Sequence, residues 1–273
     1  MSRRGFLAAA IFALFFFISA DSSASDVLRI NGNGAAFASM EILAKEFMKA
    51  NPDIKVVMTR PVIGSTGAIS ALSDGALDIA LSARPLNNDE QKKGLKELYY
   101  AKSPFVFAVS KSNKGITGLS LKDAVDIYSG NKKTYKDRSP IRIILRPEHD
   151  SDTKMLKDIS DEMSSAVRQA FSRKGMIIAP TDIDAAEEIE KIDGAIGNVV
   201  LSLIISEKRG ITPLAFNGVS ALKNKSLNPE YPYYRRFYLI TKVNPSPLAD
   251  RFLDFVRSKK GNEILLKTGH AAD

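Results

Sequence analysis

A short apolar strand followed by a turn of small or polar residues occurs three times in the first 90 residues of this chain. Strands are predicted at 27–30, 54–58 and 76–81, with helices at 38–50 and 68–73. Strands that alternate with helices form a parallel sheet with right-handed crossovers. We therefore expect an α/β fold, with mainly parallel sheets flanked by helices, in which the loops after the strands share one edge.

The loops 33–37, 64–67 and 82–84 lie at that edge, and two of them lead into a predicted helix. The start of a helix carries unpaired N–H groups and about half a positive charge. In the second loop, glycines at both ends expose the backbone, and Ser65 and Thr66 add hydroxyl groups. This pattern indicates an anion-binding cradle, although Ser-Thr-Gly before a helix is also an ordinary N-cap.

The second half of the chain repeats the pattern with an arginine. A predicted strand at 141–145 ends at Arg146, and the polar run 149–153 precedes a helix at 154–159. Arg146 is either a forked donor to an oxyanion or half of a surface ion pair with Glu148 or Asp150. Further strands are predicted at 104–109, 194–200, 211–216 and 237–241, and further helices at 87–98, 120–128, 164–173, 182–191, 201–208 and 247–258.

The N-terminus has the features of an export signal. Arg3 and Arg4 precede an apolar run at 6–18, and small residues follow. We predict a signal peptide of residues 1–24, cleaved near Ala24, with the twin-arginine and general secretory routes both open. Because the chain has no cysteine, neither a disulfide nor a lipid tether on cysteine is available, and a freely soluble periplasmic protein is predicted.

The formal net charge of +8 is compatible with nucleic acid, a membrane surface or a small anion as partner, and in a periplasm it favours a small anion or no particular partner. The basic residues are scattered without aromatic residues between them, which argues against a nucleic-acid partner.

Catalytic chemistry is poorly represented. The only histidines are His149 and His270, and the latter lies in what we expect to be a frayed C-terminal tail. His149, Asp150 and Ser151 are sequence neighbours, which cannot face one another as a catalytic triad requires. His149, Asp150 and Asp152 could in principle bind a metal, but their position before a helix favours a capping role. We predict no enzyme activity, no metal and no cofactor.

An ordered series of motifs runs through the chain: GxGxxF at 32–37, GSTG at 64–67, GxxDIAxS at 75–82, Arg146 with DSDT at 150–153, GAIG at 194–197 and Tyr-Pro at 231–232. This series resembles the periplasmic phosphate-binding proteins of ABC importers, which have the type II periplasmic binding-protein fold. The resemblance implies two α/β lobes that close on a ligand in the cleft between them. Lobe 1 would be 25–108 plus 232–273 and lobe 2 would be 109–231, joined by crossing strands at 104–109 and 237–241.

The resemblance and the predicted cradles together give the expected ligand-binding residues. These are Ala36, Phe37, Ser65, Thr66, Ser82, Arg146, Ser151 and Thr153, with Gly64, Ala83, Arg84 and Asp152 as further candidates. The chain departs from the family pattern where the family's acceptor aspartate becomes Ala83 and two loop glycines become Asp150 and Asp152. Without that acceptor, phosphate is the first expected ligand, while other oxyanions and small phosphorylated or carboxylated solutes stay open.

The function implied by the resemblance is that of a monomeric periplasmic receptor. It would capture phosphate or a related oxyanion and pass it to an inner-membrane ABC permease without catalysis. The alternative is an oxyanion-sensing or adaptor module of a signalling system with the same fold.

Overall fold

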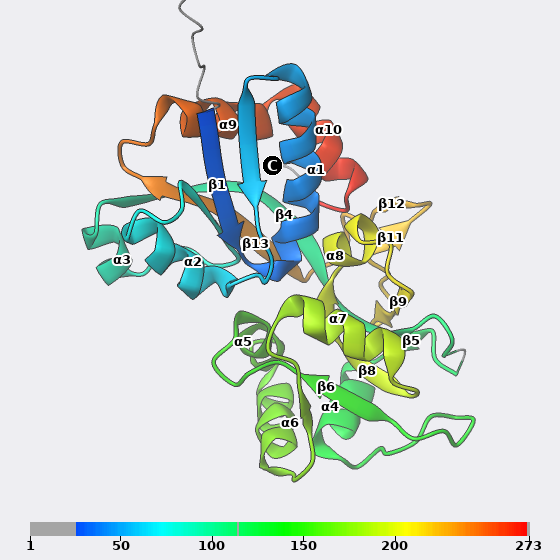
Figure 1. The fold of residues 1–273 in the computed structure, drawn as a ribbon. Helices are drawn as coiled ribbons and strands as arrows, with labels where there is room; N and C mark the ends of the chain where they lie inside the picture. Colours follow the sequence, from blue (N-terminus) through cyan, green and yellow to red (C-terminus); the bar gives the residue numbers. More distant parts are fainter. Residues whose placement is uncertain (1–25, 114, 272–273) are drawn as a thin grey trace, which may run out of the picture.

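The structure is a computed structural model that describes residues 26–113 and 115–271, so the predicted signal peptide lies outside the described residues (Figure 1). The chain has a two-lobe α/β fold. One nine-stranded sheet runs through both lobes in the order β2-β1-β3-β13-β4-β8-β6-β7, with β9 paired to β4. Its strands are β1 (Asp26–Gly32), β2 (Ile54–Met58), β3 (Ile79–Ser82), β4 (Leu95–Ser110), β6 (Arg142–Leu145), β7 (Ile177–Ile178), β8 (Ala195–Val200), β9 (Ile211–Pro213) and β13 (Tyr234–Lys242).

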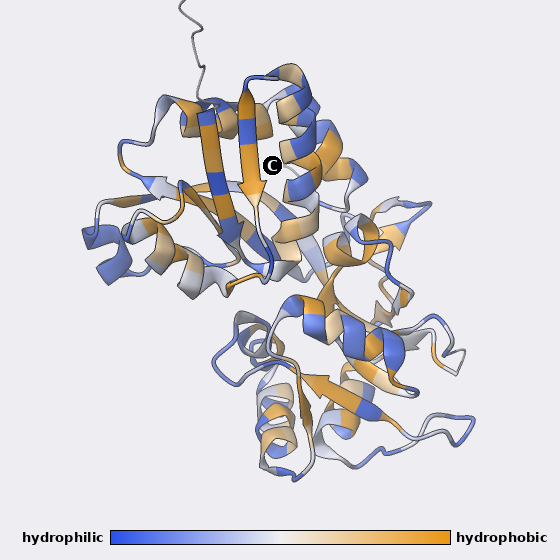
Figure 2. Cartoon of the chain, in the orientation of Figure 1, coloured by the Kyte–Doolittle hydropathy of each residue, from blue (hydrophilic) through white to orange (hydrophobic). Residues whose placement is uncertain are grey.

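Helices cover the sheet in both lobes. They are α1 (Gly34–Ala50), α2 (Gly64–Ser73), α3 (Asn88–Lys92), α4 (Leu121–Ser129), α5 (Ser151–Lys157), α6 (Asp161–Ser172), α7 (Asp182–Lys191), α8 (Leu201–Ser206), α9 (Pro247–Arg257) and α10 (Lys259–Lys267). Two small ladders complete the fold, β5 (Gly118–Leu119) with β10 (Ala215–Phe216) and β11 (Leu222–Lys223) with β12 (Ser226–Leu227). Figure 2 shows apolar residues concentrated on the strands and on the helix faces turned toward them. No helix among the residues described is long and apolar enough to cross a membrane.

Parallel pairing dominates within each lobe, as the alternation of strands and helices predicts. In the first lobe, β1 pairs in parallel with β2 and β3, and in the second, β6 pairs in parallel with β7 and β8. The carboxyl ends of these parallel strands therefore lie at the junction between the lobes, where α1, α2, α5 and α7 begin (Figure 1).

The two lobes are joined through β4 and β13. The first part of β4 pairs antiparallel with β13, up to the pair Pro104–Tyr234, and the part from Phe105 onward pairs with β8. The segment 104–109 is buried throughout, which agrees with its uninterrupted apolar sequence. The helix predicted at 87–98 is wrong beyond Lys92. A capping box starts the short helix α3, and Gly94, with φ of 71°, ends it before β4 begins.

Several other boundaries also differ from the sequence prediction: α5, α6 and β13 begin three residues earlier than predicted. Both α1 and α2 begin earlier than predicted, so that the turns at 34–37 and 64–67 form their first helical turns. The C-terminus is not frayed at His270, which is fully buried and packs against the rings of Phe237 and Tyr100 at centroid distances of 5.5 and 6.5 Å. A β-bridge between Lys102 and Ala271 holds this segment against the crossing strand β4.

Candidate functional site

A pocket of about 230 Å³ lies where the two lobes meet. Its lining from the first lobe is Asn33, Gly34, Val62, Ile63, Gly64, Ser65, Thr66, Gly67 and Arg84. Its lining from the second lobe is Arg146, Pro147, His149, Asp150, Ser151, Pro180, Thr181 and Asp182. Both halves of the predicted anion cradle therefore contribute to one pocket, which we call the interlobe pocket.

The start of α2 is the main source of backbone donors in this pocket. Most helices of the described chain begin with a side-chain cap, at Asn33, Asn87, Ser120, Asp150, Ser160, Thr181, Ser246 or Ser258. By contrast, α2 begins after Ile63 with no side-chain cap among the described residues. The start of α8 also has none, but there Ser202 N–H donates to Ser103 Oγ at 2.9 Å. The first turn of α2 thus presents uncapped N–H groups at the pocket.

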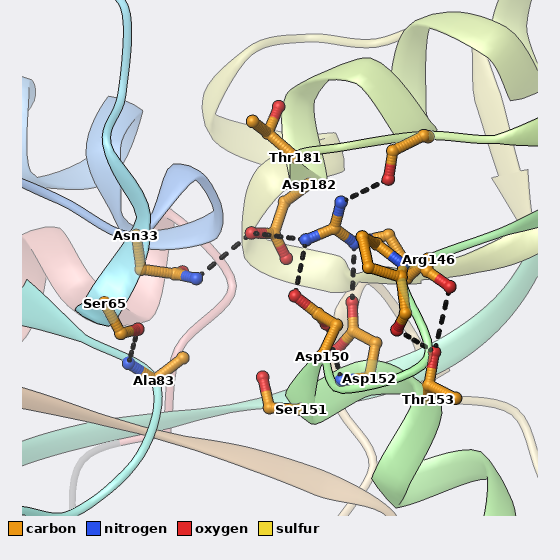
Figure 3. A network of polar contacts seen from close by, with 12 residues as sticks. Asn33, Ser65, Ala83, Arg146, Asp150, Ser151, Asp152, Thr153, Thr181 and Asp182 are labelled. Atoms are coloured by element: carbon orange, nitrogen blue, oxygen red, sulfur yellow. Dashed lines mark hydrogen bonds and ion pairs between the residues drawn. The ribbon is translucent and has the colours of Figure 1, made fainter. Parts of the chain in front are cut away.

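Two hydroxyl groups on α2 have protons available for a ligand. Ser65 Oγ accepts a hydrogen bond from Ala83 N–H at 3.1 Å, as Figure 3 shows. Thr66 Oγ1 accepts one from the Arg84 guanidinium at 3.2 Å. Because a hydroxyl group is both acceptor and donor, each of these two can still donate its proton into the pocket.

Arg84 is held at the rim by Glu90 of α3. Its two terminal nitrogens donate to the two Glu90 carboxylate oxygens at 2.8 and 2.7 Å. This contact lowers the pKa of Glu90 below its usual value, against an opposing effect of burial. The Glu90 side chain also accepts a hydrogen bond from the Asn87 backbone in the α3 capping box. The carboxylate that holds Arg84 is therefore itself held in place by the helix.

Arg146 was predicted to be either a forked donor to an oxyanion or half of a surface ion pair. It is not at the surface, because it is only 6% exposed. It follows β6 and donates to Ala179 O at 2.6 Å and to Asp150 Oδ2 at 2.8 Å (Figure 3). Asp152 and Asp182 each lie 3.8 Å from its guanidinium. Protein groups therefore hold the Arg146 side chain at the pocket wall, while its Nε atom makes no hydrogen bond among the described residues.

Arg235, which the sequence analysis did not select, is the second buried arginine of the site. It lies on the crossing strand β13 and is 2% exposed. It donates to Asp182 Oδ1 at 2.5 Å and to Ser151 Oγ, and it lies 2.9 Å from Asp152 Oδ1. The alternation of side chains along a strand could have indicated that Arg235 is buried. Residues 235, 237 and 239 point to the same face of β13, and Phe237 and Leu239 are buried apolar residues.

We call Arg146, Arg235, Asp150, Asp152 and Asp182 the aspartate–arginine cluster. Burial alone would raise the pKa of Asp182, but the charges of Arg235 and Arg146 outweigh burial and lower it. Burial, reinforced by Asp182 and Asp150, raises the pKa of Asp152 to about 7, although Arg235 and Arg146 oppose the shift. Near neutral pH, Asp182 is therefore ionised, whereas Asp152 is partly protonated.

The lobes contact each other directly beside the pocket. Asn33, the N-cap of α1, donates from Nδ2 to Asp182 Oδ2 at 3.0 Å (Figure 3). A Cβ atom placed on Gly34 would lie 3.3 Å from Ile183 Cγ1, so this glycine permits the close approach of α1 and α7.

Six of the predicted ligand-binding residues line the interlobe pocket, namely Gly64, Ser65, Thr66, Arg84, Arg146 and Ser151. The other six, Ala36, Phe37, Ser82, Ala83, Asp152 and Thr153, lie outside the lining and are buried. The hydroxyl of Thr153 donates to Pro147 O at 2.9 Å, and that of Ser82 donates to Arg84 O at 2.6 Å. The side chains of these two residues thus support the loops instead of facing the pocket.

The chemistry of the lining is that of a binding site. His149 is the single histidine in the lining and adjoins Asp150 and Ser151 in sequence, so these three cannot form a relay. In the part of the chain that the structure describes, no group of three or more histidine or acidic side chains has the arrangement of a metal site. The lining can hold an anion through N–H and hydroxyl donors.

Comparisons with known proteins agree with this geometry. A family model described as a PBP superfamily domain matches residues 19–260. The phosphate-binding protein PstS of Bacillus subtilis is 26% identical over 254 residues, covering 88% of this chain and 78% of that protein. PstS of Borreliella burgdorferi is 22% identical over 250 residues, covering 89% and 88%.

Among solved structures, a phosphate ABC transporter substrate-binding protein with bound phosphate from Clostridium perfringens superimposes with a TM-score of 0.74. The superposition covers 91% of this chain and 100% of that one at 22% identity, and it shows the same fold. Because the family match spans most of the chain and the two-lobe fold agrees with it, the chain belongs to the PBP superfamily.

Proposed function

We propose that this protein is a periplasmic receptor that captures phosphate or a related oxyanion in the interlobe pocket and passes it to an inner-membrane ABC permease. The observation that carries the proposal is the uncapped start of α2 inside a pocket lined by both lobes. A tetrahedral oxyanion placed there would accept bonds from these N–H groups and from the hydroxyls of Ser65 and Thr66. The names of the two relatives support phosphate as the first ligand to test.

The receptor binds its ligand without making or breaking bonds. Donors at the first turn of α2 hold the anion from the first lobe, and Ser151 faces it from the second. The charge of Arg84 is shared with Glu90, and that of Arg146 with Asp150. Most of the stabilisation therefore comes from neutral, directed donors, which favours one geometry of anion over a general attraction for negative charge.

The organisation of the lobes forms part of the same proposal. We place lobe 1 at 25–108 plus 232–273 and lobe 2 at 109–231, and the change of β4 from pairing with β13 to pairing with β8 between Pro104 and Phe105 supports a crossing close to this boundary. The lobes rotate about these two strands, and removal of residues 1–24 on export leaves a monomer that can open and close in the periplasm.

Calorimetry tests the function on the chain from residue 25 to 273, titrated with phosphate, arsenate and sulfate. Phosphate should bind, and Ser65→Ala should weaken binding by roughly 10- to 100-fold, since a hydrogen bond to a charged group contributes about 1.5–3 kcal/mol. Ser73→Ala, at the far end of α2, is the matched control and should bind like the parent protein. Absence of binding to all three anions, or equal loss in both variants, would refute the proposal.

A further inference from the structure

The aspartate–arginine cluster places more negative than positive charge behind a pocket that we propose binds an anion. Among the described residues, Asp150, Asp152 and Asp182 form ion pairs only with Arg146 and Arg235, so the fully ionised cluster has a net charge of −1. Two of these carboxylates, Asp150 and Asp182, are part of the pocket lining. A dianion that enters the pocket is repelled by this surplus unless the cluster takes up a proton.

The hydrogen bonds identify which aspartate can take up that proton. Asp150 accepts from the Arg146 guanidinium and from Asp152 N–H, each at 2.8 Å. Asp182 accepts from Arg235 at 2.5 Å and from Asn33 at 3.0 Å. Each of these two carboxylates therefore has two directed donors that stabilise a negative charge on it.

Asp152 differs from both. It is 1% exposed, and its Oδ1 atom accepts no hydrogen bond among the described residues although Arg235 lies 2.9 Å away. Its Oδ2 atom lies 3.8 Å from Arg146 Nε, beyond hydrogen-bond distance. Its charged form is the least well stabilised of the three.

We propose that Asp152 is the proton-accepting residue of the interlobe pocket, which takes up a proton from solvent when an anion binds and so offsets the added negative charge. This inference rests on the proposed function and assigns the charge state in which the same pocket is occupied.

The groups that face Asp152 agree with this assignment. They are Arg146 after β6, Arg235 on β13, Asp182 on α7, Asp150 at the start of α5, and Tyr128 of α4, whose pKa is raised by burial and by the charge of Asp152. Burial already raises the pKa of Asp152 to about 7. A bound anion raises it further, so the affinity falls as the pH rises above 7, by at most about tenfold per pH unit for one linked proton.

The test is calorimetry of inorganic phosphate binding at pH 8 in buffers of different ionisation enthalpy, which gives the number of protons taken up. The parent protein should take up a fraction approaching one proton more than Asp152→Asn. Asp158→Asn, an exposed change at the end of the same helix, should match the parent. The ionisation of phosphate itself contributes equally to all three. Equal uptake in the parent and Asp152→Asn would overturn the proposal.

A second measurement separates failure of this inference from failure of the proposed function. In ¹³C NMR of the ligand-free protein labelled at aspartate carboxyls, one signal should titrate near neutral pH and be absent from Asp152→Asn. Titration of every aspartate below pH 5 would overturn the inference, whatever the calorimetry shows. Without phosphate binding, a signal near neutrality would reject only the function. Asp152→Ser repeats both measurements if Asp152→Asn does not fold.

Discussion

Arg235→Met tests whether the buried cluster depends on its second cation. Arg235 lies 2.5 Å from Asp182 and 2.9 Å from Asp152, and methionine keeps the apolar stem but removes the charge. Removing one partner of a buried ion pair destabilises a protein by about 3–5 kcal/mol, because the remaining charges stay buried. We expect a loss of about 4 kcal/mol in the free energy of unfolding at pH 8.

The size of this loss should depend on pH and on Asp152. The pKa of Asp152 is raised to about 7, so this residue is mostly ionised at pH 8 and mostly protonated at pH 6. The loss should therefore be smaller at pH 6. Adding Asp152→Asn to Arg235→Met removes one unmatched carboxylate and should recover roughly 1–3 kcal/mol, which is the usual coupling between contacting residues.

Urea unfolding followed by circular dichroism at pH 8 and pH 6 measures these changes. Arg236→Met is the matched control, because residue 236 lies next on β13 with its side chain exposed, and should change stability by less than about 0.5 kcal/mol. If Arg235→Met costs less than about 1 kcal/mol at pH 8, or the double variant is no more stable than the single one, the reasoning about charge balance is wrong.

Two further predictions concern the lobe contact and the C-terminal histidine. Gly34→Leu should lower phosphate affinity at least about tenfold in calorimetry, because the new side chain would meet Ile183 and hold the lobes apart. The midpoint of thermal unfolding should change little. Unchanged phosphate affinity would contradict this prediction. Burial lowers the pKa of His270 from 6.5 to about 4, so its neutral form stabilises the fold above pH 6.5, and this contribution is lost as the pH falls toward 4. The loss should approach about 3 kcal/mol in urea unfolding and should be absent from His270→Phe, whereas the same acid dependence in both proteins would disprove the assignment.

The parts of the fold that sequence predicted are those set by local pattern. Glycine and small residues after apolar runs placed the starts of α1 and α2 within four residues of their positions in the structure. The helix predicted at 87–98 failed because its second half, rich in charged residues, belongs to β4. That segment is a strand because β13, far along the chain, pairs with it, and such tertiary pairing overrides local preference.

The parts of the site that sequence predicted are likewise those set by local pattern. Ser65 and Arg146 lie at the ends of elements that local pattern reveals, and both line the pocket. Ser151 and Thr153 differ by two positions on one helix, a rotation of about 200°, so only the first can face the pocket. Arg235 stands 84 positions from Ser151, and the crossing strand alone brings the two together.

Under the proposed function, Asp182 connects the parts of the molecule that move when the lobes open. It accepts from Asn33 of the first lobe and from Arg235 of the crossing strand, and it lies 3.8 Å from Arg146 of the second lobe. Each contact is strongest while Asp182 is ionised, and the same two arginines lower its pKa. When Asp152 is protonated, Arg146 and Arg235 pair with the carboxylates of Asp150 and Asp182. The cluster then has two positive and two negative charges. In the proposed receptor, the contact between the lobes is then held by a neutral cluster, while the neutral donors of α2 and hydroxyl groups bind the anion. A pocket built in this way can hold a dianion beside three aspartates and release it when the lobes separate.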